Sequence, residues 1–204
     1  MASEDRRARR SRRLLRESFV SLVLERGFSA VTVEDIAARA DVGRATFYTH
    51  YSDKDALLDQ IVSDLIADMN ARMAPLVSTS TEGFTGKPVL EMFRHVAEER
   101  AAYRVVLRGE GDGRALRRFT EDRVAAAVEV FAGRAAATGV TLRIDAQLLA
   151  RAWVGELVAV MQWWLETEST LTPEQITETL LDLSLRGRYW ASGFDGEPSA
   201  HRTA

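Results

Sequence analysis

Residues 31–51 read VTVEDIAARADVGRATFYTHY, and this stretch decides the fold. Thr32 followed three positions later by Asp35 is the pattern of a helix N-cap, in which the two residues bond each other's backbone. The sequence predicts a short helix after Thr32, a tight turn at residues 41–43, and a second short helix at 44–50. Two short helices joined by a three-residue turn form a helix-turn-helix.

The second of these helices divides its residues between two faces. Phe47 and Tyr51 are four positions apart, so they share a face and are expected to pack inward. The remaining residues can form hydrogen bonds and methyl contacts with base edges in a DNA major groove. This outer face consists of Arg44, Ala45, Tyr48 and Thr49. The alternative is a helical hairpin with an incidental polar face.

Helical periodicity continues on both sides of this motif. An apolar stripe from Leu14 onward stops at Gly27, and a capping pattern at Ser52–Asp55 starts a long helix at 53–73 that Pro75 is expected to end. Residues 75–87 are predicted to be a linker. Further helices are expected at 88–108, 113–137, 145–167 and 173–191. Because no segment alternates like a strand, the predicted fold class is all-α.

Composition and charge limit the function classes. The chain has 204 residues, no Cys and a net charge of −3. Residues 1–51 hold 10 Arg and 7 acidic residues, whereas residues 52–204 hold 17 Lys and Arg and 23 acidic residues. A basic N-terminal end on an acidic body suggests that this end meets an anion. The arginine-rich residues 6–13 are either a flexible arm along DNA or a solvated tail. With neither a signal peptide nor an apolar span expected, we predict a cytoplasmic bacterial protein, nucleoid-associated when DNA-bound, with no membrane partner.

Residues 14–66 resemble the DNA-binding domain of the tetracycline-repressor (TetR) family, on Gly27-Phe28 and on the stretches 31–37, 42–51 and 54–58. The resemblance implies a homodimeric, ligand-responsive repressor of a palindromic operator in double-stranded DNA. It places the DNA contacts on Thr32, Gly43, Arg44, Ala45, Tyr48, Thr49, His50 and Lys54. Asp41 stands where the family often has Gly, and Gly43 stands where it often has a Ser cap. Asp tolerates the left-handed conformation, so we expect the turn to survive.

The expected organisation has three parts. Residues 1–52 form the three-helix helix-turn-helix domain with its basic arm. Residues 53–192 form a larger helical domain for effector binding and dimerisation, with helix 53–73 connecting it to the first domain. Residues 193–204 are expected to be a disordered tail.

The last two helices are the predicted dimer interface. Helix 145–167 is apolar on most sides and must therefore be buried. Two helices from each subunit would form a symmetric four-helix contact. The interface residues expected are Leu157, Trp163, Trp164, Ile176, Leu180, Leu183 and Gly187. The alternative is a thick core within one chain.

Aromatic, methionine and polar side chains of the second domain suggest a pocket for an apolar or aromatic effector of unknown identity. The candidates are Met92, Phe93, His95, Val96, Tyr103, Phe119, Val128, Trp153 and Met161. Ordinary core packing is the alternative for each of them. Effector binding is expected to change the spacing of the two DNA-binding domains through helix 53–73 and so release the operator.

Two other classes compete with a regulator. For an enzyme, the three His residues are widely separated, and no phosphate loop, nucleophile elbow or zinc spacing occurs. His95 with its neighbouring glutamates lacks the paired Glu-x-x-His motifs of a di-iron bundle. We therefore expect no catalytic residues, no metal and no cofactor. A helical interaction module that never binds DNA is the second competitor.

Overall fold

The computed structural model describes residues 2–78, 86–167 and 169–191. Within these ranges the chain forms α-helices and one 3-10 helix and contains no strand, so the predicted all-α class is confirmed. No helix in these ranges is both long and apolar enough to cross a membrane. The elements are α1 (Ala2–Arg26), η1 (Phe28–Ala30), α2 (Val33–Arg39), α3 (Arg44–His50), α4 (Lys54–Ser78), α5 (Lys87–Glu98), α6 (Arg100–Leu107), α7 (Arg114–Thr138), α8 (Ala146–Glu166) and α9 (Pro173–Ala191).

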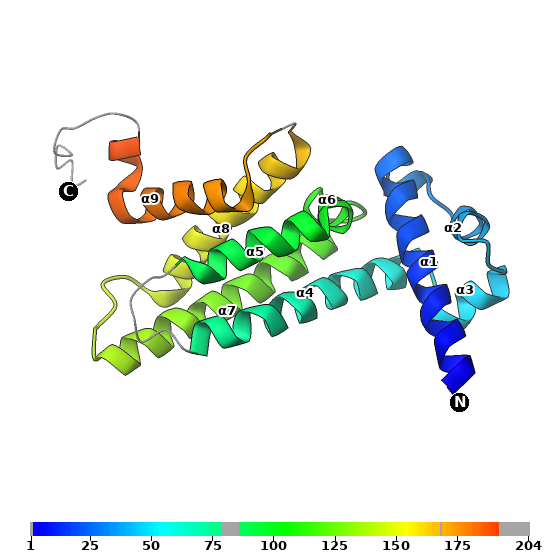
Figure 1. Ribbon diagram of the computed structural model, residues 1–204, viewed down its shortest axis with the longest axis horizontal. Coiled ribbons are helices and arrows are strands. Elements are labelled where there is room, and N and C mark those ends of the chain that lie inside the picture. Colours follow the sequence, from blue (N-terminus) through cyan, green and yellow to red (C-terminus); the bar gives the residue numbers. More distant parts are fainter. Residues whose placement is uncertain (1, 79–85, 168, 192–204) are drawn as a thin grey trace.

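The helices form a small head and a longer body (Figure 1). The head consists of α1, η1, α2 and α3 at one end of the molecule. From it, α4 runs along the body, where it packs against α5 and α7. The helices α8 and α9 cover the other side, α8 against α7 and α9 against α5. Because α4 belongs to both parts, any movement of the body that displaces α4 also displaces the head.

The head has an aromatic core that continues into the body. Phe19 and Phe47 are fully buried, and Phe28 packs edge-on against Phe19 with ring centroids 6.1 Å apart. The same cluster of buried side chains extends through α4 to α9. Two polar contacts at the edge of this cluster join the head to the body. Arg16 pairs with Glu99 at 2.7 Å, and the Phe28 N–H donates to Glu110 at 3.0 Å.

Capping patterns predicted from the sequence are confirmed at the starts of α2 and α4, and α9 begins with a further cap. The Thr32 hydroxyl accepts from the Asp35 N–H, and the Asp35 carboxylate accepts from the Thr32 N–H. Asp53 accepts from Ala56 at the start of α4. At α9, Thr172 and Gln175 bond each other's backbone N–H groups.

The predicted boundary at Pro75 is wrong, because α4 continues to Ser78 with Pro75 inside it. The proline lies in the last turn, where its missing N–H costs one backbone bond and few residues follow. Much of the predicted linker, residues 79–85, lies outside the described residues, as does the tail 193–204.

The helix predicted at 88–108 is two helices. The chain bends at Glu99, with φ −99° and ψ 27°, although its N–H still donates to His95. The bend has tertiary causes: Glu99 pairs with Arg16 of α1, and Arg100 donates to the carbonyls of Trp164 and Leu165. No proline or glycine marks this position, so periodicity alone did not reveal the break.

The remaining corrections concern the two ends of the described chain. The segment 6–13, expected as an arm or tail, belongs to α1, whose helix starts at Ala2. At the other end, α9 is interrupted at Gly187, whose φ of 82° and ψ of 169° are not helical. The apolar stripe predicted to run along this helix therefore does not continue in a straight line to Gly187.

Candidate functional site

Helix α3 is fixed to the head by one aromatic side chain. Phe47 is fully buried and packs against the rings of Tyr48 and Tyr51, with centroids 5.6 and 5.8 Å away. Tyr51 ends the helix and is itself buried. The opposite face is exposed, and it holds Arg44, Ala45, Tyr48 and Thr49. The structure thus has the two faces predicted for this helix, and DNA contact by the outer one stays a prediction.

Arg44, at the start of α3, is held by an acidic residue of α2. Its guanidinium lies 2.5 Å from the Glu34 carboxylate, and both side chains are more than half exposed. An exposed ion pair of this kind contributes little to stability. Arg44 must leave Glu34 to reach a guanine edge, so Glu34 competes with DNA for this arginine.

Two predicted threonine contacts are exposed but have partners within the head. Thr49 donates its hydroxyl to the Ala45 carbonyl at 2.9 Å, and Thr32 donates to the Asp35 carboxylate at 2.6 Å. The Asp35 pKa is lowered by these bonds with Thr32, first by the hydroxyl and then by the backbone N–H. Gly43 caps α3 without a side chain, so it offers only its backbone to a phosphate.

Lys54 has an internal role that the sequence did not indicate. Its ammonium donates to the carbonyls of Phe28 and Val31, both at 2.8 Å, and lies 4.4 Å from the centre of the Phe28 ring. Two of its three N–H donors therefore fasten the segment 28–31 to the start of α4. Lys54 thus helps to hold the head together, and its predicted phosphate contact stays a prediction.

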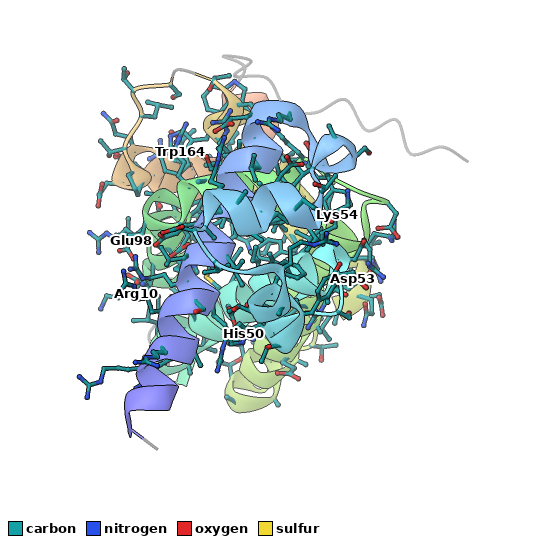
Figure 2. All side chains as sticks on the ribbon, turned by 90° about the vertical axis from the view of Figure 1, so that its right-hand side faces the viewer. Arg10, His50, Asp53, Lys54, Glu98 and Trp164 are labelled. Atoms are coloured by element: carbon teal, nitrogen blue, oxygen red, sulfur yellow. The ribbon has the colours of Figure 1, made fainter. Side chains whose placement is uncertain are left out.

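A basic groove runs between α1 and the end of α3. Four arginines of α1 line it opposite Thr49, His50 and Tyr51, around a cavity of about 510 Å³. These arginines are Arg9, Arg12, Arg13 and Arg16. Figure 2 views the head end-on and shows the neighbouring Arg10 on α1, to one side of His50. Partial burial and then the charge of Arg12 lower the pKa of His50.

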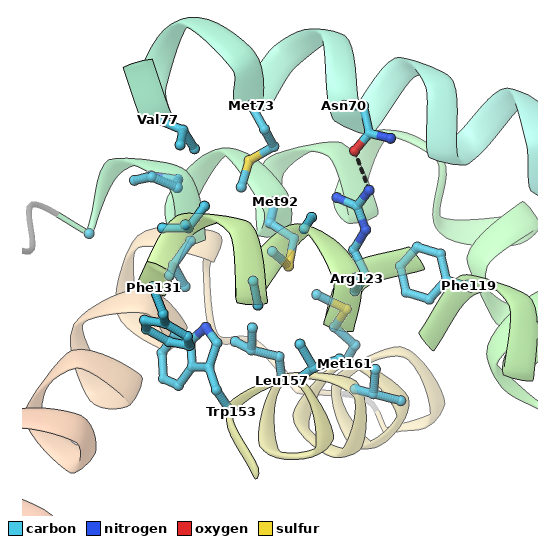
Figure 3. Close-up of a pocket in the computed structure, with 18 of the residues that line it drawn as sticks. Asn70, Met73, Val77, Met92, Phe119, Arg123, Phe131, Trp153, Leu157 and Met161 are labelled. Carbon is cyan, nitrogen blue, oxygen red and sulfur yellow. Dashed lines mark hydrogen bonds between the residues drawn. The ribbon is translucent and has the colours of Figure 1, made fainter. Parts of the chain in front are cut away.

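A second cavity, of about 140 Å³, lies in the body between α4, α5, α7 and α8 (Figure 3). Of the nine predicted pocket residues, four line it: Met92, Phe119, Trp153 and Met161. The other five do not. Phe93, His95, Val96 and Tyr103 are fully buried in the core, and Val128 packs against the smaller cluster around Val154. Apolar periodicity identifies buried residues but not which of them border an empty space.

The sequence analysis missed the polar residues of this pocket. Asn70 of α4 and the two arginines Arg123 and Arg134 of α7 line it among apolar side chains. Arg123 is 6% exposed. Its Nε donates to Asp122 at 3.1 Å, and its Nη2 contacts both Asp122 and Asn70. In the sequence, the sign of this site is an arginine inside a helix whose neighbouring residues are mostly apolar.

Most residues predicted for a dimer interface face the interior of their own chain. Leu157, Trp164, Ile176 and Leu180 are buried, Leu157 in the pocket wall, and Leu183 packs against the main core. The helix α9 packs against α5 of the same chain, and a contact of its predicted residues with a second subunit stays a prediction. Trp163 differs, since it is 50% exposed.

An outward face of α8 is exposed instead. It has large apolar residues near its ends, Leu148 at 61% and Trp163 at 50% exposure. Small residues lie between them at helical spacing, and these are Ala152, Gly155 and Ala159. A side chain added at Gly155 would meet no described atom within 4 Å. This face, on the same helix as part of the predicted contact, is one surface open to a partner.

Two family models match successive parts of the chain. Residues 20–61 match the model described as bacterial regulatory proteins, tetR family. Residues 87–185 match the model described as a transcriptional regulator C-terminal region. The first match covers α2, α3 and their supports, and the second covers the body from α5 to α9.

Individual relatives agree with these matches. The chain is 31% identical to the HTH-type transcriptional repressor DhaR of Mycobacterium sp. (strain GP1) over 86 residues, 42% of this chain and 41% of that protein. It is 40% identical over 58 residues to the uncharacterized HTH-type transcriptional regulator YvaF of Bacillus subtilis, 28% of this chain and 30% of that one. The matched segments thus span less than half the length of these curated relatives.

Solved structures share the fold over nearly the whole chain. NalD of Pseudomonas aeruginosa, the secondary repressor of the MexAB-OprM multidrug efflux pump, has a TM-score of 0.71 at 18% identity, covering 88% of this chain and 97% of that chain. A TetR-family regulator from Syntrophomonas wolfei also has a TM-score of 0.71, at 17% identity, covering 93% of this chain and 97% of that one. At these identities the likeness concerns the fold alone.

Proposed function

The chain belongs to the tetR family of bacterial regulatory proteins, and from this premise we propose that it is a repressor that binds a palindromic operator as a homodimer and releases it when a small, largely apolar effector binds. The observation that carries the proposal is α3, a short helix with one buried aromatic face and one exposed polar face. Its exposed face has the residue types that a major groove accepts. We place its action in the cytoplasm.

DNA binding combines base reading by α3 with phosphate contacts by α1. Arg44 is assigned to a guanine edge, with Tyr48 and Thr49 beside it. The arginines of the basic groove lie next to the end of α3. With α3 in the major groove of DNA, the sugar-phosphate backbone beside that major groove would run past these arginines. Phosphate contacts give affinity and register, while base contacts give specificity. The overall charge of −3 does not oppose this, because these cations are concentrated in the head.

Dimerisation supplies the second reading helix. Palindromic half-sites lie about 34–36 Å apart, so a pair of heads must be held at that separation. The exposed apolar face of α8 supports a contact between two copies of the chain, because a symmetric pair would bury Leu148 and Trp163. The body then sets the distance between the two heads.

Effector binding is assigned to the pocket in the body. It is bordered by α4, the helix that carries the head, and by three further helices. A ligand that favours a different placement of α4 changes the spacing of the heads and weakens operator binding. Such couplings amount to about 1–3 kcal/mol.

A selection of bound sequences from random duplex DNA tests the proposal and yields the operator. The purified chain is then titrated against that operator and a scrambled duplex over a salt series. We expect specific binding that weakens steeply with salt. Arg44→Ala should cost about 1–3 kcal/mol on the operator, with less effect on the scrambled duplex.

The matched control is Arg94→Ala, which removes one exposed arginine from α5 in the body, where it pairs with Glu174. This variant should bind like the wild type. Equal affinity for every duplex, or no loss of affinity in Arg44→Ala, would contradict the assignment of α3 as the reading helix.

A further inference from the structure

The body pocket has an unusual distribution of charge. Among the described residues that line it, Arg123 and Arg134 are the charged ones, and no Asp or Glu contributes to the lining. Most other lining residues are apolar, including Met92, Trp153 and Leu157. Such a wall suits an apolar ligand body, and the two cations disfavour a positively charged ligand.

Arg123 is placed to meet a ligand. Its guanidinium extends from α7 toward α4 at the edge of the apolar space, with Asn70 above it and the pocket methionines beside it (Figure 3). Its hydrogen bonds use Nε and Nη2: the carboxylate of Asp122, the residue before it on α7, accepts from both nitrogens as an ion pair, and the neutral amide of Asn70 accepts from Nη2. A carboxylate can bind a guanidinium through two parallel N–H···O bonds, which adds opposite charge and geometric specificity that a single bond to a neutral amide oxygen lacks.

We propose that the effector is an apolar carboxylate whose acid group binds Arg123 in competition with the Asn70 amide oxygen. This inference rests on the proposed function and adds the chemical class of the ligand. Asn70 belongs to α4, so an acid that takes Arg123 removes a tie between α7 and the helix that carries the head. The ligand's charge thereby acts on the contact through which a buried cation of the pocket holds α4.

The cavity volume bounds the apolar part. A cavity of about 150 Å³ in another protein holds a benzene ring, and the volume here is about 140 Å³. A single ring or a short alkyl chain therefore fits. Suitable probes are 3-phenylpropanoate and octanoate, each compared with the alcohol of the same carbon skeleton.

Calorimetric titration of the wild type with each acid and its alcohol is the first measurement. We expect each acid to bind at least about tenfold more tightly than its alcohol, the lower end of what one charge-assisted bond contributes. In Arg123→Gln the ratio of the alcohol's Kd to the acid's Kd should fall to near one, while the alcohol still binds. Operator release by the same acids, followed by fluorescence anisotropy, should need correspondingly higher acid concentrations in this variant.

The matched control is Arg118→Gln, which removes another bond from α7 to α4 without altering the pocket. Arg118 donates to the Asp59 carbonyl and the Ser63 hydroxyl and does not line the cavity. It should keep the preference for the acid. Asn70→Asp provides a test with Arg123 intact, because the new carboxylate would itself pair with the Arg123 guanidinium. The affinity for the acid should fall at least several-fold, and the affinity for the alcohol should not change.

The possible failures are distinguishable. Equal affinity of acid and alcohol in the wild type, or an unchanged preference in Arg123→Gln, overturns the role of Arg123 and leaves the pocket as an effector site. If neither member of a pair binds up to its solubility, both this inference and the effector part of the proposed function fail. Operator binding without any ligand is unaffected by these outcomes.

Discussion

Nδ1 of His95 lies 3.0 Å from the hydroxyl of Tyr103, and both side chains are fully buried. On the other side of the ring, Nε2 lies 2.8 Å from the Asp68 carboxylate of α4, a close contact whose geometry falls short of a hydrogen bond. Tyr103 packs edge-on against Phe119 in the pocket wall, with centroids 5.6 Å apart. The histidine expected to line the pocket therefore lies behind it and joins α5 to α4 and α6.

His95 makes stability depend on pH. Burial, and next the charge of Arg72, lower its pKa, while Asp68 opposes them. The lowered pKa means that the folded chain favours the neutral imidazole more than the unfolded chain does. The contribution of His95 to the free energy of unfolding is therefore complete above the ordinary histidine pKa of 6.5 and is lost as the pH falls below that value. Below pH 6.5 the unfolding free energy of the wild type should decrease faster than that of His95→Gln, by up to about 1.4 kcal/mol per pH unit. Urea denaturation at pH 7.5, 6.5 and 5.5 measures this difference.

Carboxylates surround this histidine, and they are Asp68, Glu98 and Glu99. They are present in both proteins, so the comparison with His95→Gln isolates the imidazole. Parallel pH profiles for the two proteins would show that His95 takes up its proton equally in the folded and unfolded chain, contrary to the prediction.

The turn before α3 depends on one residue in the left-handed region. Asp41 has a φ of 53°, the one positive φ among the described residues other than glycine. Asp tolerates this conformation better than Ala, and Gly adopts it freely. Asp41→Ala should lower the free energy of unfolding by about 1 kcal/mol, whereas Asp41→Gly should cost less than half of that. Thermal denaturation of the three proteins compares them, and equal losses would mean that the backbone angle is not the cause.

Local chemistry made the head predictable. The capping box of Thr32, the turn at Asp41 and the buried position of Phe47 are decided by residues within a few positions of each other. Their outcome therefore follows from the sequence. Lys54 shows the limit, since its partners are the carbonyls of Phe28 and Val31, more than twenty positions away. A lysine after a reading helix looks the same in the sequence whether it meets a phosphate or its own chain.

The body was predictable as helices but not as a site. Helical periodicity identifies a buried face, and it did so for α5, α8 and α9. It does not say which neighbour covers that face, so Ile176 and Leu180 were assigned to a partner although α5 covers them. The bend at Glu99 and the pocket position of Arg123 depend in the same way on contacts between distant helices.

Most mutations of a binding site weaken binding, but breaking the ion pair between Arg44 and Glu34 is expected to strengthen operator binding. Glu34→Gln frees Arg44 and removes a negative charge beside the reading helix. Operator affinity should rise several-fold, because Arg44 no longer has to leave a partner to reach its base. Fluorescence anisotropy at low and moderate salt measures the gain, which should shrink as salt screens the pair.

Glu25→Gln is the control for this change, because it removes the same charge from the head while leaving Arg44 paired. Glu25 accepts from Arg39 and Ser21, and its pKa is lowered to about 2, chiefly by Arg39. A gain of equal size in both variants would mean that overall charge, and not release of Arg44, is responsible.

The outward face of α8 gives the test of the dimer. Ala159 is exposed on it between Gly155 and Trp163, so a larger side chain there would project into a partner packed on this face. Ala159→Arg should convert the wild-type dimer, of twice 22.7 kDa, into a monomer with an unchanged melting profile at low concentration. Operator affinity should fall by about a hundredfold or more, since the second half-site no longer adds its contacts at high effective concentration.

Ala97→Arg, on the exposed side of α5, is the matched control and should remain a dimer. Sedimentation velocity decides between the two, and a wild type that sediments as a monomer, or an Ala159→Arg protein that stays dimeric, would remove α8 from the interface.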